Sequence, residues 1–134
     1  MATTRVLCAV VLALGLALAV PAHAETDWSK AQDLSVVASD YQFSPKTVTF
    51  EHGGIYRLHL ENHGKETHEF HSAEFFKAAT LRDPSVLGTE KDEVVLQPGS
   101  SKDVYLVAPA APGKFPLYCP DHDWAGMTGE IIVK

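Results

Sequence analysis

The sequence has little cysteine: its 134 residues contain only Cys8 and Cys119. Cys8 lies inside an N-terminal apolar run that we predict to be removed, so that one thiol remains and no internal disulfide can form. In an oxidising compartment an unpaired thiol persists when it is buried, used in catalysis or bound to a metal. A buried apolar cysteine and a metal ligand are both open at this point.

The sequence also lacks an apolar run long enough to span a membrane. Arg5 precedes a run of small and apolar residues from Val6 to Val20, which ends in a proline and a small-x-small pattern. A transmembrane helix needs about 20 apolar residues, whereas this arrangement is typical of a secretory signal peptide. We predict that residues 1–24 are a signal peptide cleaved after Ala24, and that residues 25–134 form one periplasmic domain without membrane insertion.

Basic residues are scarce relative to acidic ones. The chain has 11 Lys and Arg against 17 Asp and Glu, and removal of Arg5 with the signal peptide leaves 10 against 17, a net charge of −7. Such an acidic surface argues against nucleic acid or anionic membrane as partners and favours a basic protein partner. We expect a monomer.

Helical periodicity is almost absent. Short runs rich in Val, Thr, Tyr and Phe recur between Gly, Pro and Asn turn signals, which is the pattern of an antiparallel all-β domain. We expect a β-sandwich of eight strands: Asp33–Ala38, Lys46–Phe50, Ile55–Glu61, Thr67–His71, Glu93–Leu96, Lys102–Val107, Lys114–Cys119 and Gly129–Val133.

One segment of the sequence favours a helix. Ser72 can cap a short helix from Ala73 to Thr80, and Phe75 and Phe76 can pin this helix to the sandwich. The polar stretch from Leu81 to Asp92 is expected to be a loop.

The stretch YCPDHDWAGM, residues 118–127, places a thiol, an imidazole and a thioether between two expected strands. Cys119, His122 and Met127 follow a Cys-x2-His-x4-Met spacing, so a strand end and a tight turn can aim all three at one point. With one more imidazole they form the His2Cys site with a weak axial Met that suits copper in both oxidation states.

Zinc is the rival metal, although structural zinc sites usually carry paired cysteines and do not use Met. Cysteine-nucleophile catalysis needs a base and an orienting group, and no such pattern surrounds the thiol.

The second imidazole has to come from another strand at the same end of the sandwich. His68 begins an expected strand after a loop, and His71 is its rival. Because their offset is odd, the two side chains point to opposite faces of a regular strand. Only one of them can face the core and the metal.

Two assemblies of residues, in this order, resemble the cupredoxins over essentially the whole chain after residue 24. The first is Phe43-Ser44-Pro45, Gly54-Ile55-Tyr56-Arg57, Asn62 and His68-Glu69-Phe70; the second is Pro112-Gly113-Lys114-Phe115-Pro116-Leu117-Tyr118-Cys119-Pro120-Asp121-His122 and Gly126-Met127-Thr128-Gly129. The resemblance implies a Greek-key β-sandwich with one type 1 copper, whose ligands map onto His68, Cys119, His122 and Met127.

Two departures of this sequence from the cupredoxin pattern bear on its more specific function. Small cupredoxins that carry electrons often have Asn after the first ligand His, where this chain has Glu69, and Asp121 and Asp123 flank His122. The stretch from His68 to Phe76 looks like the cupredoxin-type proteins of bacterial copper tolerance. We therefore expect a periplasmic copper-binding protein that takes part in copper homeostasis. Oxidation of Cu(I) is left open as an activity, and we expect no other enzymatic role.

The alternative function is a mobile one-electron carrier between periplasmic redox proteins. Its partner would be a redox protein, whereas a copper-handling protein has copper ions as cargo. A second copper site is a further hypothesis; its ligands would come from some of His52, His59, His63 and His71.

Overall fold

The computed structural model describes residues 24–134. The predicted signal peptide lies outside the described residues except for Ala24 and stays a prediction. Within the described part of the chain, no helix is both long enough and apolar enough to cross a membrane.

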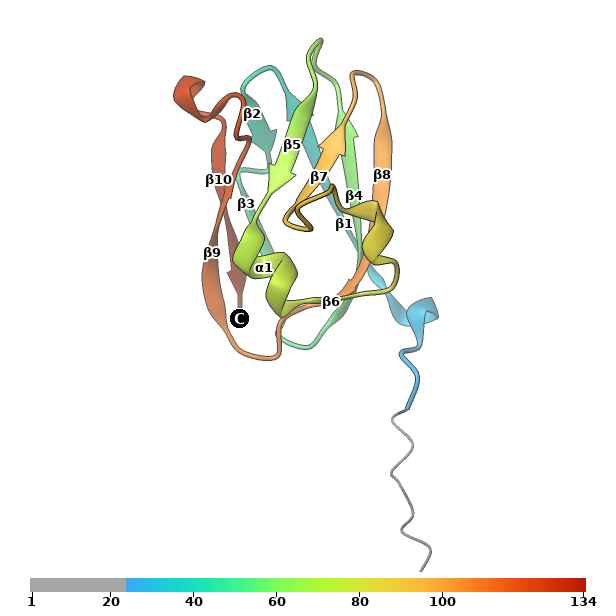
Figure 1. Cartoon of the computed structure of the whole chain (residues 1–134). Helices are drawn as coiled ribbons and strands as arrows, with labels where there is room; N and C mark the ends of the chain where they lie inside the picture. The colour runs from blue at the N-terminus through green and yellow to red at the C-terminus, as the bar shows by residue number, and fades with distance from the viewer. Residues whose placement is uncertain (1–23) are drawn as a thin grey trace, which may run out of the picture.

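Two five-stranded sheets face each other (Figure 1). The first has the order β2-β1-β4-β8-β6, made of Gln42–Ser44, Gln32–Ser39, Ile55–Asn62, Ser101–Val107 and Thr80–Leu81. The second has the order β3-β10-β9-β5-β7, made of Thr47–Phe50, Thr128–Val133, Gly113–Tyr118, His68–His71 and Glu93–Leu96. The expected all-β sandwich is confirmed, and all eight predicted strands are present within one or two residues.

The sequence pattern missed two short strands and two parallel pairings. β2 and β6 span three and two residues, too few for a periodicity to show. β1 pairs in parallel with β4, and β3 with β10, so the expectation of purely antiparallel strands is wrong. In both cases the chain leaves the sheet before it returns beside the earlier strand, and such a return does not force the opposite direction as a hairpin does.

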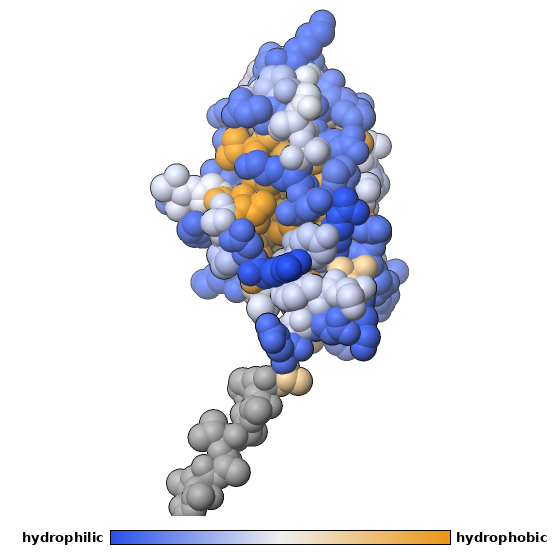
Figure 2. Space-filling view, turned by 90° about the vertical axis from the view of Figure 1, so that its right-hand side faces the viewer, coloured by the Kyte–Doolittle hydropathy of each residue, from blue (hydrophilic) through white to orange (hydrophobic). Residues whose placement is uncertain are grey.

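The inner faces of the two sheets form one apolar core. Within Ile55 to Leu60 the sequence alternation predicts Tyr56, Leu58 and Leu60 as core. All three are buried along β4, while the intervening residues are half-buried. Phe50 and Phe70 contribute fully buried rings from the second sheet. The flank beside β8 is largely hydrophilic, with apolar side chains showing between the charged ones (Figure 2).

The one α-helix, α1 (Ala73–Ala78), lies close to its predicted position and buries Phe75 and Phe76. It ends two residues earlier than expected because Ala79 is extended and Thr80 enters β6. Ser72 is its N-cap residue, but the Ser72 side chain makes no capping hydrogen bond. Three 3-10 turns complete the described elements: η1 (Trp28–Lys30), η2 (Pro84–Val86) and η3 (Asp123–Ala125).

Three segments meet at the end of the sandwich drawn uppermost in Figure 1. They are the turn between β1 and β2, the loop that leads from β4 into β5, and the loop between β9 and β10 that contains η3. These segments come from both sheets, so the packed core fixes their relative positions.

Candidate metal centre

His68, Cys119 and His122 lie together at this end of the sandwich. His68 is the first residue of β5, Cys119 follows β9, and His122 precedes η3. One nitrogen or sulfur atom of each lies within 4.8 Å of the others. The exposed fractions are 0%, 0% and 8%, so the three side chains form a group shielded from solvent.

Met127, the fourth predicted ligand, closes the same loop. Its carbonyl accepts a hydrogen bond from the Cys119 amide at 3.0 Å, and its own amide donates to the His122 carbonyl at 3.3 Å. The Met127 side chain is fully buried. The backbone therefore ties all three residues of the Cys-x2-His-x4-Met spacing into one compact turn.

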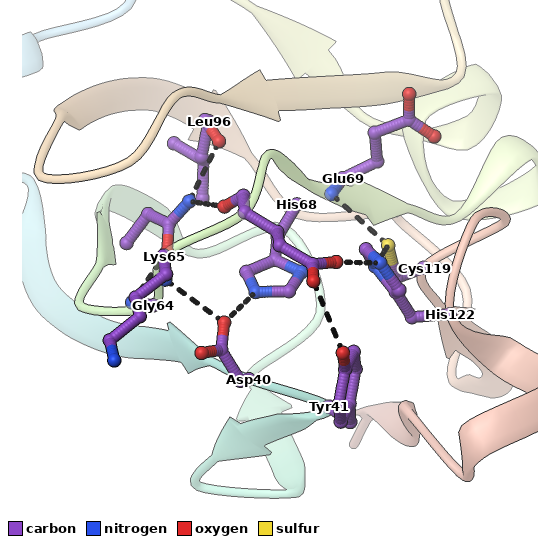
Figure 3. A network of polar contacts seen from close by, with 11 residues as sticks. Asp40, Tyr41, Gly64, Lys65, His68, Glu69, Leu96, Cys119 and His122 are labelled. Carbon is purple, nitrogen blue, oxygen red and sulfur yellow. Dashed lines mark hydrogen bonds and ion pairs between the residues drawn. The ribbon is translucent and has the colours of Figure 1, made fainter.

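Carboxylates hold both imidazoles at Nε2 (Figure 3). His68 Nε2 is 3.2 Å from Asp40 Oδ1, and His122 Nε2 is 2.6 Å from Glu66 Oε2. An ionised carboxylate only accepts hydrogen bonds, so each Nε2 carries a proton, and in the neutral ring Nδ1 is then the nitrogen with the lone pair.

The two Nδ1 atoms are the ones available to a metal. His68 Nδ1 is buried without a hydrogen-bond partner, and His122 Nδ1 lies 3.5 Å from Cys119 Sγ. A buried polar atom left unpaired costs about 1–3 kcal/mol, and a metal ion relieves that cost. Two imidazole nitrogens, one sulfur and a neighbouring thioether are the donor set that suits copper, so the residues fit this metal.

Burial raises the pKa of the Cys119 thiol, and nearby backbone N–H groups partly oppose this effect. One of these donors is the Glu69 amide, 3.4 Å from Sγ. Metal coordination removes the thiol proton. The Glu69 carboxylate points away from the sulfur (Figure 3), so Glu69 acts at the site through its backbone.

Asn62 organises the loop between β4 and β5. Its buried side chain donates to the carbonyls of Glu66 and Leu96 at 2.8 and 2.9 Å and accepts from the Gly64 amide at 2.8 Å. A Cβ on Gly64 would lie only 2.8 Å from His68 Nε2. The loop thus places Glu66 and leaves room for the contact between Asp40 and His68.

Sequence reasoning missed Asp40 and Glu66. Glu69, Asp121 and Asp123 are adjacent to His68 or His122 in sequence, which favours them as carboxylates that orient an imidazole. None of their side chains forms a hydrogen bond with His68 or His122 in the described residues. Asp40 follows β1, and Glu66 lies two residues before His68. The available signal was the position of both residues in turns at the same end of the sandwich.

Tyr41 packs against His122, and Trp124 packs against the Tyr41 ring. The Tyr41 ring centre lies 5.1 Å from that of His122 and 6.1 Å from that of Trp124. Tyr41 and Trp124 are 37% and 78% exposed, the large apolar side chains most open to solvent in residues 24–134. Tyr41 also donates to Glu66 Oε1 at 3.2 Å, and this bond raises the pKa of its phenol.

The sequence and fold were compared with those of known proteins. The family model of the cupredoxin-like domain matches residues 8–133. The chain belongs to the cupredoxin family. This result confirms the resemblance read from the sequence and, with it, a type 1 copper protein. The assignment of its four ligands stays a proposal.

Similar proteins agree with this membership. This cupredoxin is 29% identical over 119 residues to the chloroplast plastocyanin of Chlamydomonas reinhardtii. The aligned residues cover 89% of this chain and 74% of that protein. It superposes on dithionite-reduced auracyanin from Roseiflexus castenholzii with a TM-score of 0.56 at 19% identity, covering 78% of this chain and 98% of that one. For auracyanin B the TM-score is 0.59 at 22% identity, with 84% and 93% covered. The last two likenesses show the fold.

Each of the four surplus histidines of this cupredoxin contacts a polar group outside the candidate copper site. His52 contacts the carbonyl of Lys134, His59 contacts Asp103 and Glu61, His63 contacts Glu61, and His71 contacts Asp92. Only His71 joins a group of three candidate ligands within the described residues. No group of candidate ligands in residues 24–134 contains two of these four histidines, so a second copper site built from some of them stays a hypothesis.

His59 gives a pH-dependent contribution to stability. A 2.6 Å contact between its Nδ1 and Asp103 is the main cause that raises the His59 pKa. Because the folded pKa is raised, this contribution is fully present below the unfolded value of about 6.5 and is lost as pH rises through the folded pKa. His59→Gln should therefore destabilise the protein more at pH 5.5 than at pH 8.5, by about 0.5–1 kcal/mol. Urea unfolding at the two pH values measures this, and an equal loss at both would contradict it.

Proposed function

We propose that this protein is a periplasmic type 1 copper protein that transfers single electrons, with His68, Cys119, His122 and Met127 as ligands. Copper bound to these side chains would supply a reversible one-electron couple. Cys119 would hold the metal as a thiolate, His68 and His122 would hold it through their Nδ1 atoms, and Met127 would contribute its thioether as a weak ligand. Asp40 and Glu66 hold the rings, so the donor atoms keep their positions.

The observation that carries this function is the setting of His122. His122 is 8% exposed, and its ring packs against the exposed ring of Tyr41, which in turn packs against the exposed ring of Trp124. Aromatic side chains are enriched where proteins dock on one another. A redox partner that covers Trp124 would approach the ligand closest to solvent.

The test is electron self-exchange between oxidised and reduced protein, measured by NMR line broadening. The copper-loaded protein should hold one copper per chain and take up one electron. Trp124→Ala should slow self-exchange several-fold at an unchanged potential, because it removes apolar docking surface beside His122. Trp28→Ala is the matched control, since Trp28 lies in η1 at the other end of the sandwich (Figure 1). Equal rates in both variants would rule out docking at this face.

Copper homeostasis is the second candidate function. Asp121 and Asp123 are exposed on either side of His122, and negative charge at this entrance favours the approach of a cation. A deletion strain separates the two functions. Sensitivity to added copper would support copper handling and an accompanying Cu(I) oxidation, whereas normal tolerance with a respiratory defect would leave electron transfer alone.

A further inference from the structure

A second cluster of potential ligands lies on the outer face of the second sheet. It consists of His71, the last residue of β5, together with Asp92 and Glu93 at the start of β7. One donor atom of each lies within 4.8 Å of the others. His71 and Glu93 face each other across the antiparallel pair β5–β7, so sheet register holds two of the three side chains in place.

Buried polar atoms without partners concentrate at this cluster. In residues 24–134 four buried side-chain atoms lack a hydrogen bond, and one of them is His68 Nδ1 in the candidate copper site. The other three are His71 Nδ1, Ser72 Oγ and Asp92 Oδ1. Ser72 is fully buried and its amide donates to the Asp92 carbonyl at 3.0 Å. A buried polar atom without a hydrogen bond indicates a ligand atom in the candidate copper site, and the same feature occurs at the His71 cluster.

The charges at the cluster favour a cation. His71 Nε2 lies 3.1 Å from Asp92 Oδ2, and no Lys or Arg in the described part of the chain forms an ion pair with Asp92 or Glu93. The side chains of His71 and Asp92 are 12% and 26% exposed, so solvent reaches them.

We propose that His71, Asp92 and Glu93 form a second metal site for a divalent first-row transition ion such as Zn²⁺, Mn²⁺ or Fe²⁺. One imidazole and two carboxylates suit these ions, whereas Ca²⁺ and Mg²⁺ take oxygen ligands alone and Cu(I) prefers sulfur. A bound ion would neutralise the two carboxylates. The site differs in ligand chemistry from the centre at Cys119, because it offers one imidazole and two carboxylates and no sulfur.

The two sites are adjacent through β5 and β9. The His71 ring lies 4.5 Å from the Tyr118 ring, and Tyr118 directly precedes Cys119. A dication bound at His71 therefore adds positive charge close to the first site. Positive charge favours the reduced, less charged state of a neighbouring redox centre, and the reduction potential should rise when the second site fills.

Titration of copper-loaded protein with Zn²⁺ tests the site, since copper blocks binding at Cys119. Calorimetry and metal analysis should find one additional Zn²⁺ per chain, and voltammetry should find a higher potential. Asp92→Asn and His71→Gln should each weaken Zn²⁺ binding at least tenfold and remove the rise in potential. The matched control is Glu61→Gln, which changes another carboxylate in contact with histidine and should leave both readouts unchanged.

Folding and copper loading are checked separately. An unchanged far-UV spectrum shows that Asp92→Asn is folded, and Asp92→Ser provides a smaller replacement if it is not. If the protein takes up no copper, the titration is made on Cys119→Ser, where any tight Zn²⁺ binding reports on His71, Asp92 and Glu93. Absence of Zn²⁺ binding, or binding that Asp92→Asn does not weaken or that Glu61→Gln weakens equally, would overturn the proposal.

Discussion

Cys119→Ser is expected to abolish the intense visible absorption band of the copper-loaded protein. That band requires electron transfer from a thiolate to Cu(II), and a serine hydroxyl does not ionise at neutral pH. The substitution changes one buried atom of a loop held by backbone bonds to Met127 and His122, so the fold should persist. Visible absorption after addition of one equivalent of Cu(II) measures the effect.

The control for this experiment is His63→Gln, which removes an exposed imidazole bonded to Glu61. This variant should keep the full band. If the band survives in Cys119→Ser, or if it disappears in both variants, the assignment of Cys119 as the copper ligand is incorrect.

Asn62→Ala is expected to lower the free energy of unfolding by about 3 kcal/mol, since it removes three hydrogen bonds and leaves one buried and two half-buried backbone groups unpaired. The carbonyls of Glu66 and Leu96 lose a donor, and the amide of Gly64 loses an acceptor. Copper affinity should fall as well, because the same loop positions Glu66 against His122 and leads into His68. Urea unfolding of the metal-free protein measures the first effect, and competition with a copper chelator measures the second.

Gln97→Ala is the matched control for Asn62→Ala. It removes an amide whose carbonyl accepts from the hydroxyl of Thr67 at the surface, so water can replace the lost bond. Its effect should stay within about 0.5 kcal/mol. A similar loss of stability in both variants would show that the buried position of Asn62 is not the cause.

The sequence predicted the strands of the sandwich well because their signals are local. Alternation along β4 identified Tyr56, Leu58 and Leu60 as core, and the odd offset of His68 and His71 placed them on opposite faces. The spacing of Cys119, His122 and Met127 fixed a single loop. In each case residues close in sequence carried the information.

The groups around the ligands could not be predicted in the same way. Asp40 meets His68 across 28 positions and Glu66 meets His122 across 56, so both contacts depend on how the two sheets pack. Asp121 and Asp123 are adjacent to His122 in sequence, and this proximity favoured them as its partners. They are exposed, and the carboxylate that contacts the ring comes from another loop.

The contact between Glu66 and His122 bears on whether copper is a resident cofactor or cargo. The other three proposed ligands, His68, Cys119 and Met127, are fully buried, so the route from solvent runs past His122. That ring can turn outward only after it separates from Glu66, and Glu66 is itself bonded to Tyr41. These two contacts slow the release and uptake of copper by a larger factor than they change the equilibrium affinity for copper. The protein would therefore hold its metal over many redox cycles, and a copper donor or acceptor would have to displace Glu66 first.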